Sequence, residues 1–453
     1  LREGRREYPP PELIIQDELH LISGPLGSMV GHYEAVIGEL CTSDDGTPVK
    51  VVASTATIAR ASEQVRALYA TEKSFLFPPQ GLKWGSSFFA EERRDLAGRY
   101  YVGVFATALP SQQTAMVRVL SSLLQAPLLA DADPSVIDPY WTLISYFNSI
   151  RELGSAATLV SADIREYMKV LHRRIALTPE WPRESDRRRW LRRPTLELTS
   201  RVPSGEIGST LQSLFDPFSG ELGSAVDVCL ATNMIQVGLD VSRLGLMTVA
   251  GQPKTTSEYI QATSRVGRKE PGLVVVLLNP SKPRDRSHYE HFRAYHERIY
   301  SWVEPTSVTP FALPVRDRAL HALMVAMIRF WGDTSIRYRP DPPPSDELTD
   351  RIRRVILERV DLVDAEALQS IERYFDHILR RWNTSPPPRY GGFGPADEEL
   401  PLMYPYGSEP LPAWNALAVG PPWPTPSSMR NVDATCELGV VPEYYIPDEK
   451  ATQ

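Results

Sequence analysis

The stretch Leu13-Ile14-Ile15-Gln16-Asp17-Glu18-Leu19-His20 decides how the rest of the chain is interpreted. Its short apolar run is typical of a buried strand, and two carboxylates follow that run directly. Adjacent side chains of a strand point to opposite faces, but at its end the chain turns and both can reach one site. There Asp17 would hold Mg²⁺ through the water shell of the ion, and Glu18 would polarise an attacking water. A solvated acidic turn is the alternative.

A second stretch, Gln261-Ala262-Thr263-Ser264-Arg265-Val266-Gly267-Arg268, lies far downstream and follows a helical pattern. Gln261, Arg265 and Arg268 share one helix face at spacings of four and three. Two guanidinium groups on one face suit a triphosphate. Gly267 lets backbone approach closely, which favours function over the alternative of a solvated basic face.

Two threonines, Thr55 and Thr57, follow a predicted strand over residues 49–54. Their hydroxyls could form hydrogen bonds on the side of the site where His20 lies. Such bonds could signal the phosphate state of the nucleotide from one domain to the other. The alternative is an ordinary helix cap, because threonine caps helices well.

The segment from Thr232 to Asp240 follows another predicted strand. Gly238 permits a tight turn there, and Asp240 can cap the next element or bind a ribose hydroxyl. A plain strand–turn–strand is an equally open interpretation.

The highest local concentration of positive charge lies between Arg183 and Arg193, a segment with six arginines and two acidic residues. With Trp190 among them, this segment could track phosphates and stack a base. We expect Arg188, Arg189 and Arg192 to contact nucleic acid; a solvated linker or a protein-contact patch is the alternative.

Composition limits the class of protein. The chain has 453 residues, 42% hydrophobic and 23% charged, which allows two to three domains. Its net charge of −7 gives no general affinity for nucleic acid, so any such surface is local. The apolar runs are too short to span a bilayer. Three widely spaced cysteines suit a reducing cytoplasm, where we expect the protein.

Two candidate metal or nucleophile sites are weak. His288, His291 and His296 with Glu290 mimic metal-ligand spacing, but a further ligand and a cysteine are lacking, so we expect no metal there. Cys229 lies within a predicted strand and is expected in the core.

Strands alternate with helical patterns up to residue 285, which predicts a parallel sheet with crossovers. Asp and Pro at turn positions between 131 and 139 mark the best domain boundary. Beyond residue 285 the pattern becomes helical, and from Ser385 it is rich in Pro and Gly. We therefore expect four regions: 1–135 and 136–285, each α/β, a helical region 286–384, and an irregular tail 385–453 that wraps the core.

As an ordered set, these strings resemble motifs II to VI of superfamily 2 helicases of the DExH type. The set comprises Asp17–His20, Thr55–Thr57, Tyr146–Ser149, Thr232–Asp240 and Gln261–Arg268. Ser264 stands where that family has the first Gly of its last motif. The resemblance covers roughly residues 10–285.

The resemblance implies two RecA-like domains, with the first only partly present before residue 135. ATP would lie in the cleft between them and a DNA strand across their tops. Asp17 and Glu18 would serve Mg²⁺ and water, His20, Thr55 and Thr57 would couple the domains, and Asp240 would approach the ribose. Arg265 and Arg268 would be finger residues that, with Gln261 and Gly238, contact the nucleotide. The residues implied to touch nucleic acid are Asn148, Ser149, Ser200, Arg201, Thr232 and Asn233.

Finer features, among them Asp17 to Ser28 and Tyr146 to Leu153, look like the helicase subunit of DISARM anti-phage systems. One departure is large: no Gly-Lys-Thr or Gly-Lys-Ser occurs anywhere in the sequence. We expect the phosphate loop to come from an upstream segment or another chain, and this chain alone to be inactive as an ATPase.

The resulting hypothesis is the C-terminal part of an ATP-dependent DNA helicase or translocase that serves phage defence, beside another defence-system subunit. An RNA helicase is one alternative, since the motifs do not separate DNA from RNA. A non-catalytic scaffold that binds nucleic acid or a partner subunit is another, although intact Glu18, Arg265 and Arg268 argue against it.

Overall fold

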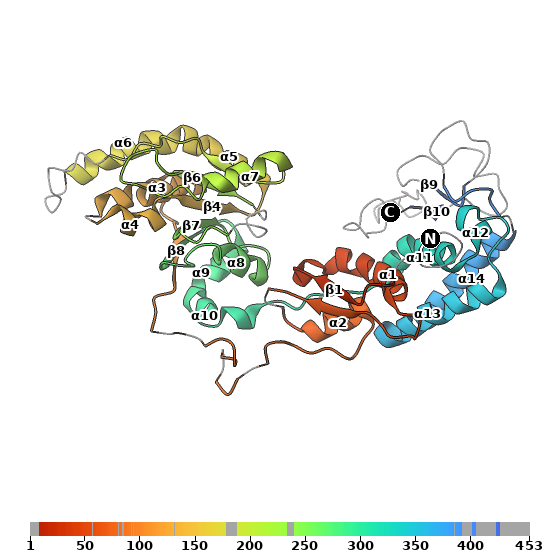
Figure 1. Ribbon diagram of the computed structural model, residues 1–453. Coiled ribbons are helices and arrows are strands. Elements are labelled where there is room, and N and C mark those ends of the chain that lie inside the picture. Colours follow the sequence, from red (N-terminus) through yellow and green to blue (C-terminus); the bar gives the residue numbers. More distant parts are fainter. Residues whose placement is uncertain are drawn as a thin grey trace, which may run out of the picture. The chain divides into compact units, whose positions relative to one another are not determined.

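The structure of the protein is a computed structural model. It describes residues 9–56, 58–79, 81–83, 86–91, 93, 95–130, 132–177, 188–232, 240–384, 386–391, 401–404 and 423–425. The chain divides into two compact units. The sheet unit runs from Leu76 to Glu304, and the helical unit combines Leu1–Phe75 with Pro305–Gln453. Figure 1 shows both.

The sheet unit is built on six parallel strands in the order β3–β8–β7–β4–β6–β5. Their bounds are β3 (Arg99–Phe105), β4 (Leu143–Phe147), β5 (Leu196–Leu198), β6 (Val228–Ala231), β7 (Leu246–Ala250) and β8 (Gly272–Leu278). All residues of β4 and β6 are buried, as expected for a parallel sheet with both faces covered. The predicted α/β fold with a parallel sheet is confirmed.

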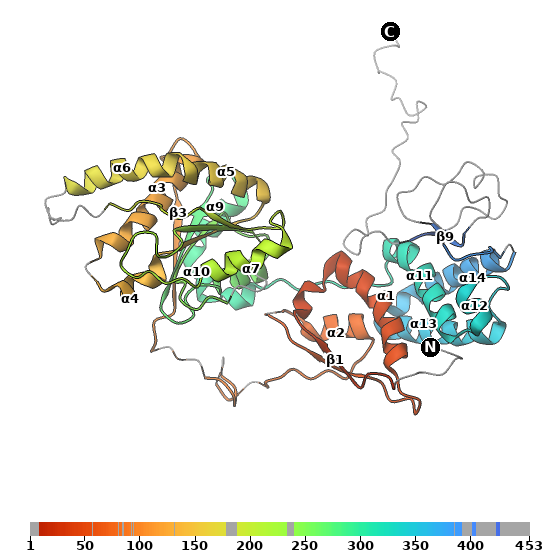
Figure 2. The ribbon, with the colours of Figure 1, turned by 45° about the horizontal axis from the view of Figure 1, so that its top comes forward.

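Alternate residues of β4 belong to two different cores, because neighbouring side chains face opposite sides of a sheet. Leu143 and Phe147 pack with α3 (Gln112–Gln125), α5 (Ile150–Ser161) and α6 (Asp163–Ala176). Figure 2 shows these three helices together. Ile144 and Tyr146 pack with α8 (Thr256–Thr263) and α10 (Phe292–Glu297), and the buried Cys229 lies in this second core, as predicted. The unit also contains α4 (Pro134–Ile137), α7 (Ser204–Ser213) and α9 (Pro283–Glu290).

The expected domain boundary at residue 135 is not where the structure divides. Strand β3 pairs with β8 along its whole length, from Arg99 beside Gly272 to Phe105 beside Leu278. This pairing places β3 and α3 in the sheet unit instead of the first domain. The local apolar pattern predicted the strand and the helix correctly, but it does not say which sheet a strand joins.

The helical unit joins two distant parts of the sequence. Strands β1 (Leu13–Gln16) and β2 (Lys50–Ala53) pair in parallel. Helices α1 (Gly24–Cys41) and α2 (Ala61–Tyr69) pack together, and α1 also packs on α11 (Leu313–Trp331). The unit also contains α12 (Thr334–Tyr338), α13 (Asp346–Asp364) and α14 (Leu368–Thr384). Residues 305–384 therefore do not form the separate region 286–384 that the sequence suggested.

Close packing joins α1 to the segment that returns from the sheet unit. A Cβ at Gly31 would lie 2.5 Å from Cγ of Pro310, so only glycine fits there. Of the tail, the structure describes β9 (Met403–Tyr404), which pairs with β10 (Trp423–Pro424), and a few neighbouring residues; most of the predicted tail lies outside the described residues. Within the described residues, no helix combines the length and apolar character needed to cross a bilayer.

Two histidines are buried in the helical unit. Nε2 of His32 lies 2.6 Å from the Pro310 carbonyl oxygen, and Nε2 of His321 lies 2.8 Å from that of Pro424. Burial lowers the pKa of each imidazole to about 4, because the charged form would lose its hydration. Both side chains are therefore neutral at pH 7.

We expect the free energy of unfolding to fall as the pH drops from 6.5 toward 4. In this window the unfolded chain protonates both histidines while the folded protein keeps them neutral, so protons favour unfolding. Each histidine should cost about 2 kcal/mol at pH 5 and almost nothing at pH 7. Urea unfolding at several pH values measures this dependence. His321→Gln should flatten it, and an unchanged slope in that variant would contradict the assignment.

Candidate functional site

Asp17 lies where β1 ends, beside the end of β2. Its Oδ1 accepts hydrogen bonds from the Ser54 hydroxyl and, at 2.9 Å, from the Glu18 amide. The Ser54 bond above all, and then the amide bond, lower the pKa of this exposed carboxyl group. Asp17 is therefore ionised at neutral pH, with its second oxygen outside these two bonds.

This donor set fits a hydrated Mg²⁺. Such an ion usually keeps several waters and binds through one or two carboxylates plus substrate phosphates. Asp17 and Glu18 are adjacent carboxylates of this kind. Among the described residues, no group of three or more His, Cys, Asp or Glu side chains gathers into a closed metal cage. Asp17 and Glu18 are the residues that would hold such an ion through its water shell, and this role stays a prediction.

Glu18 has an unusual backbone. Its φ of 52° and ψ of 45° are left-handed, a conformation that costs a non-glycine residue of order 1–3 kcal/mol. The next amide, of Leu19, donates to the Ser54 carbonyl at 2.9 Å and holds the turn in place. Oε2 of Glu18 lies 3.3 Å from Nδ1 of His20. The turn therefore brings the two candidate catalytic side chains together.

The segments Asp17–His20 and Thr55–Thr57 of the helical unit contact each other through Ala56. Its amide donates to Nδ1 of His20 at 3.3 Å. The Thr55 hydroxyl instead donates to the Ala56 carbonyl at 3.0 Å, and Thr57 lies outside the described residues. A backbone group, and not the predicted Thr55 hydroxyl, thus makes the described contact with His20.

Gln64 is a supporting residue that the sequence did not reveal. This buried side chain of α2 donates to the carbonyl oxygens of Leu19, at 3.0 Å, and Ile22, at 2.7 Å. Its own oxygen accepts from the Thr306 hydroxyl at 3.1 Å. A lone glutamine in a helix gives no sequence signal for this role.

Arg265 and Arg268 do not continue the helix that carries Gln261. Helix α8 ends at Thr263, and Gly267 has a φ of 70°. The Gly267 amide donates to the Leu244 carbonyl at 2.8 Å, and a Cβ there would lie 2.8 Å from Gly272. The predicted common helix face is wrong, because the left-handed glycine turns the chain before Arg268.

Arg99, at the start of β3, braces this turn. Its Nε donates to the Val266 carbonyl at 2.7 Å, and a terminal nitrogen donates to that of Ser264 at 3.3 Å. Sequence analysis missed this residue because it lies far upstream. Gln261 itself is only 9% exposed.

Arg268 forms an ion pair with Asp240. A phosphate that binds Arg268 would compete with this carboxylate, which is itself well exposed. Asp240 thus makes a contact within the protein, and its expected contact with a ribose stays a prediction. Gly238 and Asn233 lie outside the described residues.

The predicted nucleic-acid residues gather at one edge of the sheet. Asn148, Ser200 and Thr232 follow β4, β5 and β6, which are neighbours in the parallel sheet, so their carboxyl ends meet. The Asn148 side chain donates to the Ala250 carbonyl at 3.1 Å, and Thr232 is buried.

Two further residues of this edge also bond within the protein. Ser149 caps α5 by accepting from the Glu152 amide at 3.2 Å. Arg201 makes a two-pronged contact with Glu197, at 2.7 and 3.0 Å. Ser149, Ser200 and Arg201 are exposed at this edge, and their contact with nucleic acid stays a prediction.

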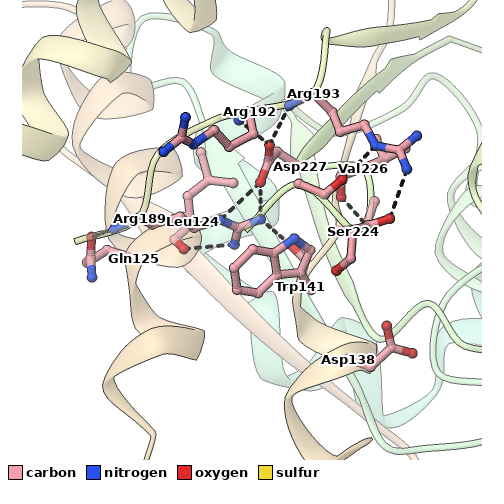
Figure 3. A network of polar contacts seen from close by, with 12 residues as sticks. Leu124, Gln125, Asp138, Trp141, Arg189, Arg192, Arg193, Ser224, Val226 and Asp227 are labelled. Atoms are coloured by element: carbon pink, nitrogen blue, oxygen red, sulfur yellow. Dashed lines mark hydrogen bonds and ion pairs between the residues drawn. The ribbon is translucent and has the colours of Figure 1, made fainter. Parts of the chain in front are cut away.

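The basic segment divides into buried and exposed arginines. Figure 3 shows the polar contacts of Arg189, Arg192 and Arg193 with Asp227. Arg189 is 1% exposed, lies 3.0 Å from Asp227 and donates to the carbonyl oxygens of Leu124 and Trp141. Its guanidinium group lies 3.8 Å from the Trp141 ring centre. Burial lowers its pKa to about 10. The predicted nucleic-acid role of Arg189 is therefore wrong, because the side chain is enclosed in the core.

Asp227 organises the rest of this segment. Its Oδ2 accepts from the backbone amides of Arg192, at 2.8 Å, and Arg193, at 3.2 Å. The guanidinium group of Arg188 lies 3.6 Å from the ring centre of Trp190. Contact of Arg188 and the exposed Arg192 with nucleic acid stays a prediction. Arg183 and Arg187 lie outside the described residues.

The chain resembles superfamily 2 helicases in sequence and in fold. The family described as helicase conserved C-terminal domain matches residues 204–270, which include Asp240, Arg265 and Arg268. The helicase Lhr of Mycobacterium smegmatis, in a structure bound to ssDNA and AMP-PNP, has a TM-score of 0.50 and 16% identity. The match covers 81% of this chain and 38% of Lhr, and it shows the fold.

The chain resembles in particular the DISARM protein DrmA of Bacillus paralicheniformis (strain ATCC 9945a / NCIMB 11709 / CD-2). The two are 44% identical over 385 residues, which are 83% of this chain and 33% of DrmA. The chain thus spans about a third of the length of this relative.

We expect Arg189→Ala to lower the free energy of unfolding of the sheet unit by about 3–5 kcal/mol, because it leaves Asp227 buried and unpaired. Arg192→Ala is the matched control. Its side chain is exposed and only its backbone amide bonds Asp227, so the change should stay within about 0.5 kcal/mol. Urea unfolding followed by circular dichroism measures both. Equal midpoints for the two variants would contradict the structural role of Arg189.

Proposed function

We propose that the chain is the C-terminal part of an ATP-dependent DNA helicase or translocase that acts in phage defence. The relationship to DrmA, a DISARM protein, carries this proposal. The presence of ssDNA and a nucleotide analogue on Lhr supports the choice of ligands. A further defence-system subunit is the proposed partner.

The proposed chemistry is hydrolysis of the terminal phosphoanhydride of Mg²⁺–ATP. Asp17, ionised and held by Ser54, would orient the water shell of the ion. Glu18 would accept a proton from the attacking water at Oε2, close to His20. Arg265 and Arg268, on the turn fixed by Gly267, would stabilise negative charge on the terminal phosphate.

Coupling between nucleotide and movement would run through His20. Its Nδ1 lies within 3.3 Å of both Glu18 and the Ala56 amide. A change in the position of Glu18 during hydrolysis would thus be felt at the end of β2, and we propose this contact as the coupling element in place of the Thr55 hydroxyl. Nucleic acid would lie at the carboxyl edge of the large sheet, where Ser200 and Arg201 are exposed.

Glu18→Gln should abolish ATP turnover and leave ATP binding nearly intact, because it removes the base and keeps the shape. The assay uses this chain as part of a protein of DrmA length, where we propose that the phosphate loop lies. Glu63→Gln, an exposed change on α2, is the matched control and should behave as wild type. Loss of nucleotide affinity in parallel with turnover would indicate a structural role for Glu18.

Arg265→Ala and Arg268→Ala should each slow hydrolysis strongly, since arginine fingers contribute on the order of 10³–10⁵ in rate. Lys269→Ala removes a positive charge from an exposed neighbour and should leave the rate unchanged. The measurement is single-turnover hydrolysis with nucleic acid present. If the three variants hydrolyse ATP equally fast, the two arginines do not act on the nucleotide.

A further inference from the structure

Helix α14 has three chemically different faces. Ile371, Phe375, Ile378 and Trp382 are buried in the core of the helical unit. A second face carries Glu372 and Asp376, and both carboxylates lie within 4.0 Å of Arg353 on α13. The third face, at spacings of three and four, carries Ser370, Arg373, Tyr374, His377, Arg380 and Arg381. This third face has no carboxylate of its own.

A shallow, open pocket of about 240 Å³ lies on this third face, between α14 and α11. Arg316, Ser370, Arg373, Tyr374 and His377 line it. Arg316 is fixed inside the pocket, because it donates to the Ser370 hydroxyl at 2.6 Å and lies 4.6 Å from the Tyr374 ring centre. A guanidinium group held in this way is pre-organised for an anion.

The charges around the pocket leave it positive. Arg316 pairs with Asp317, which offsets its charge. Arg373 donates to the Gln369 side-chain oxygen, and Arg380 donates to the Asp376 carbonyl oxygen. Among the described residues neither arginine has a carboxylate partner. Two exposed cations thus lie on one helix face in a protein with a net charge of −7.

We propose that this face of α14, with the pocket at its side, binds the phosphate backbone of single-stranded nucleic acid. It would be a second contact for the strand, separate from the carboxyl edge of the large sheet. This proposal depends on the proposed function for one point only, namely that the ligand is a nucleic acid. The pocket would hold one phosphate beside Arg316 and Arg373, and Arg380 would meet the next part of the strand.

The spacing of the cations favours a polymer over a single phosphate ion. Arg373 and Arg380 are seven residues apart, which is about 10 Å along a helix axis. Successive phosphates of one strand rise about 3.4 Å along a duplex axis, so this distance spans more than one phosphate. Neighbouring phosphates of one strand could therefore contact Arg373 and Arg380 separately.

The test is binding of a fluorescent oligothymidylate to the full chain as a function of salt. Arg373→Ala/Arg380→Ala should flatten the slope of log K against log salt by about 1.4, since each lost phosphate contact removes about 0.7. If both proteins bind equally at 1 M salt, the variant is then weaker by roughly 25-fold at 0.1 M. Inorganic phosphate should compete only weakly with the oligonucleotide for wild type.

The matched control is Arg339→Ala/Arg354→Ala, which removes two other exposed arginines of the helical unit. Its slope should equal that of wild type, and all three proteins should melt at the same temperature. Parallel slopes for the α14 variant and wild type would overturn the proposal, as would strong competition by inorganic phosphate.

Arg201→Ala separates this outcome from failure of the proposed function. If Arg201→Ala weakens binding while the α14 variant does not, the sheet edge binds nucleic acid and α14 does not. If wild type binds no oligonucleotide, the α14 proposal fails outright, and hydrolysis by the Glu18 and arginine variants decides the proposed function independently.

Discussion

The parallel pairing of all six strands is the constraint on which the sheet unit depends. Because every strand runs the same way, each connection must cross a face of the sheet, and all carboxyl ends meet at one edge. Asn148, Ser200 and Thr232 are thereby brought together from distant parts of the sequence. Helix α8 follows β7 and leads back to the amino end of β8. The turn with Arg265 and Arg268 therefore lies at the amino edge of the sheet, opposite the carboxyl edge.

Burial on both faces also decides what the charged residues near the sheet can do. Arg189 and Arg192 are three residues apart in one basic segment, yet one is enclosed with Asp227 and the other is exposed. Local charge density predicted the same role for both. What separates them is a carboxylate at the start of β6, and an aspartate next to a buried strand is visible in the sequence only once the strand is known to be central.

Much of the fold followed from local patterns, and the rest did not because it depends on distant partners. The apolar runs and the polar strings after them predicted the parallel sheet, and the ends of β1, β4 and β6 lie where those strings begin. The pairing of β3 with β8, and of α1 with α11, joins segments that no local period connects. At the candidate site the residue types were predictable. The left-handed turns at Glu18 and Gly267, and the support from Gln64 and Arg99, were not, because they arise from tertiary contacts.

The segment that leaves the sheet unit is bonded at both of its ends to elements of the candidate site. Glu304 accepts from the Thr256 amide at 2.8 Å and so caps α8, the helix that leads to Arg265. Two residues later, Thr306 donates to Gln64, whose amide nitrogen holds the loop after Glu18. A cap on one side and a buried glutamine on the other thus anchor a very short connection.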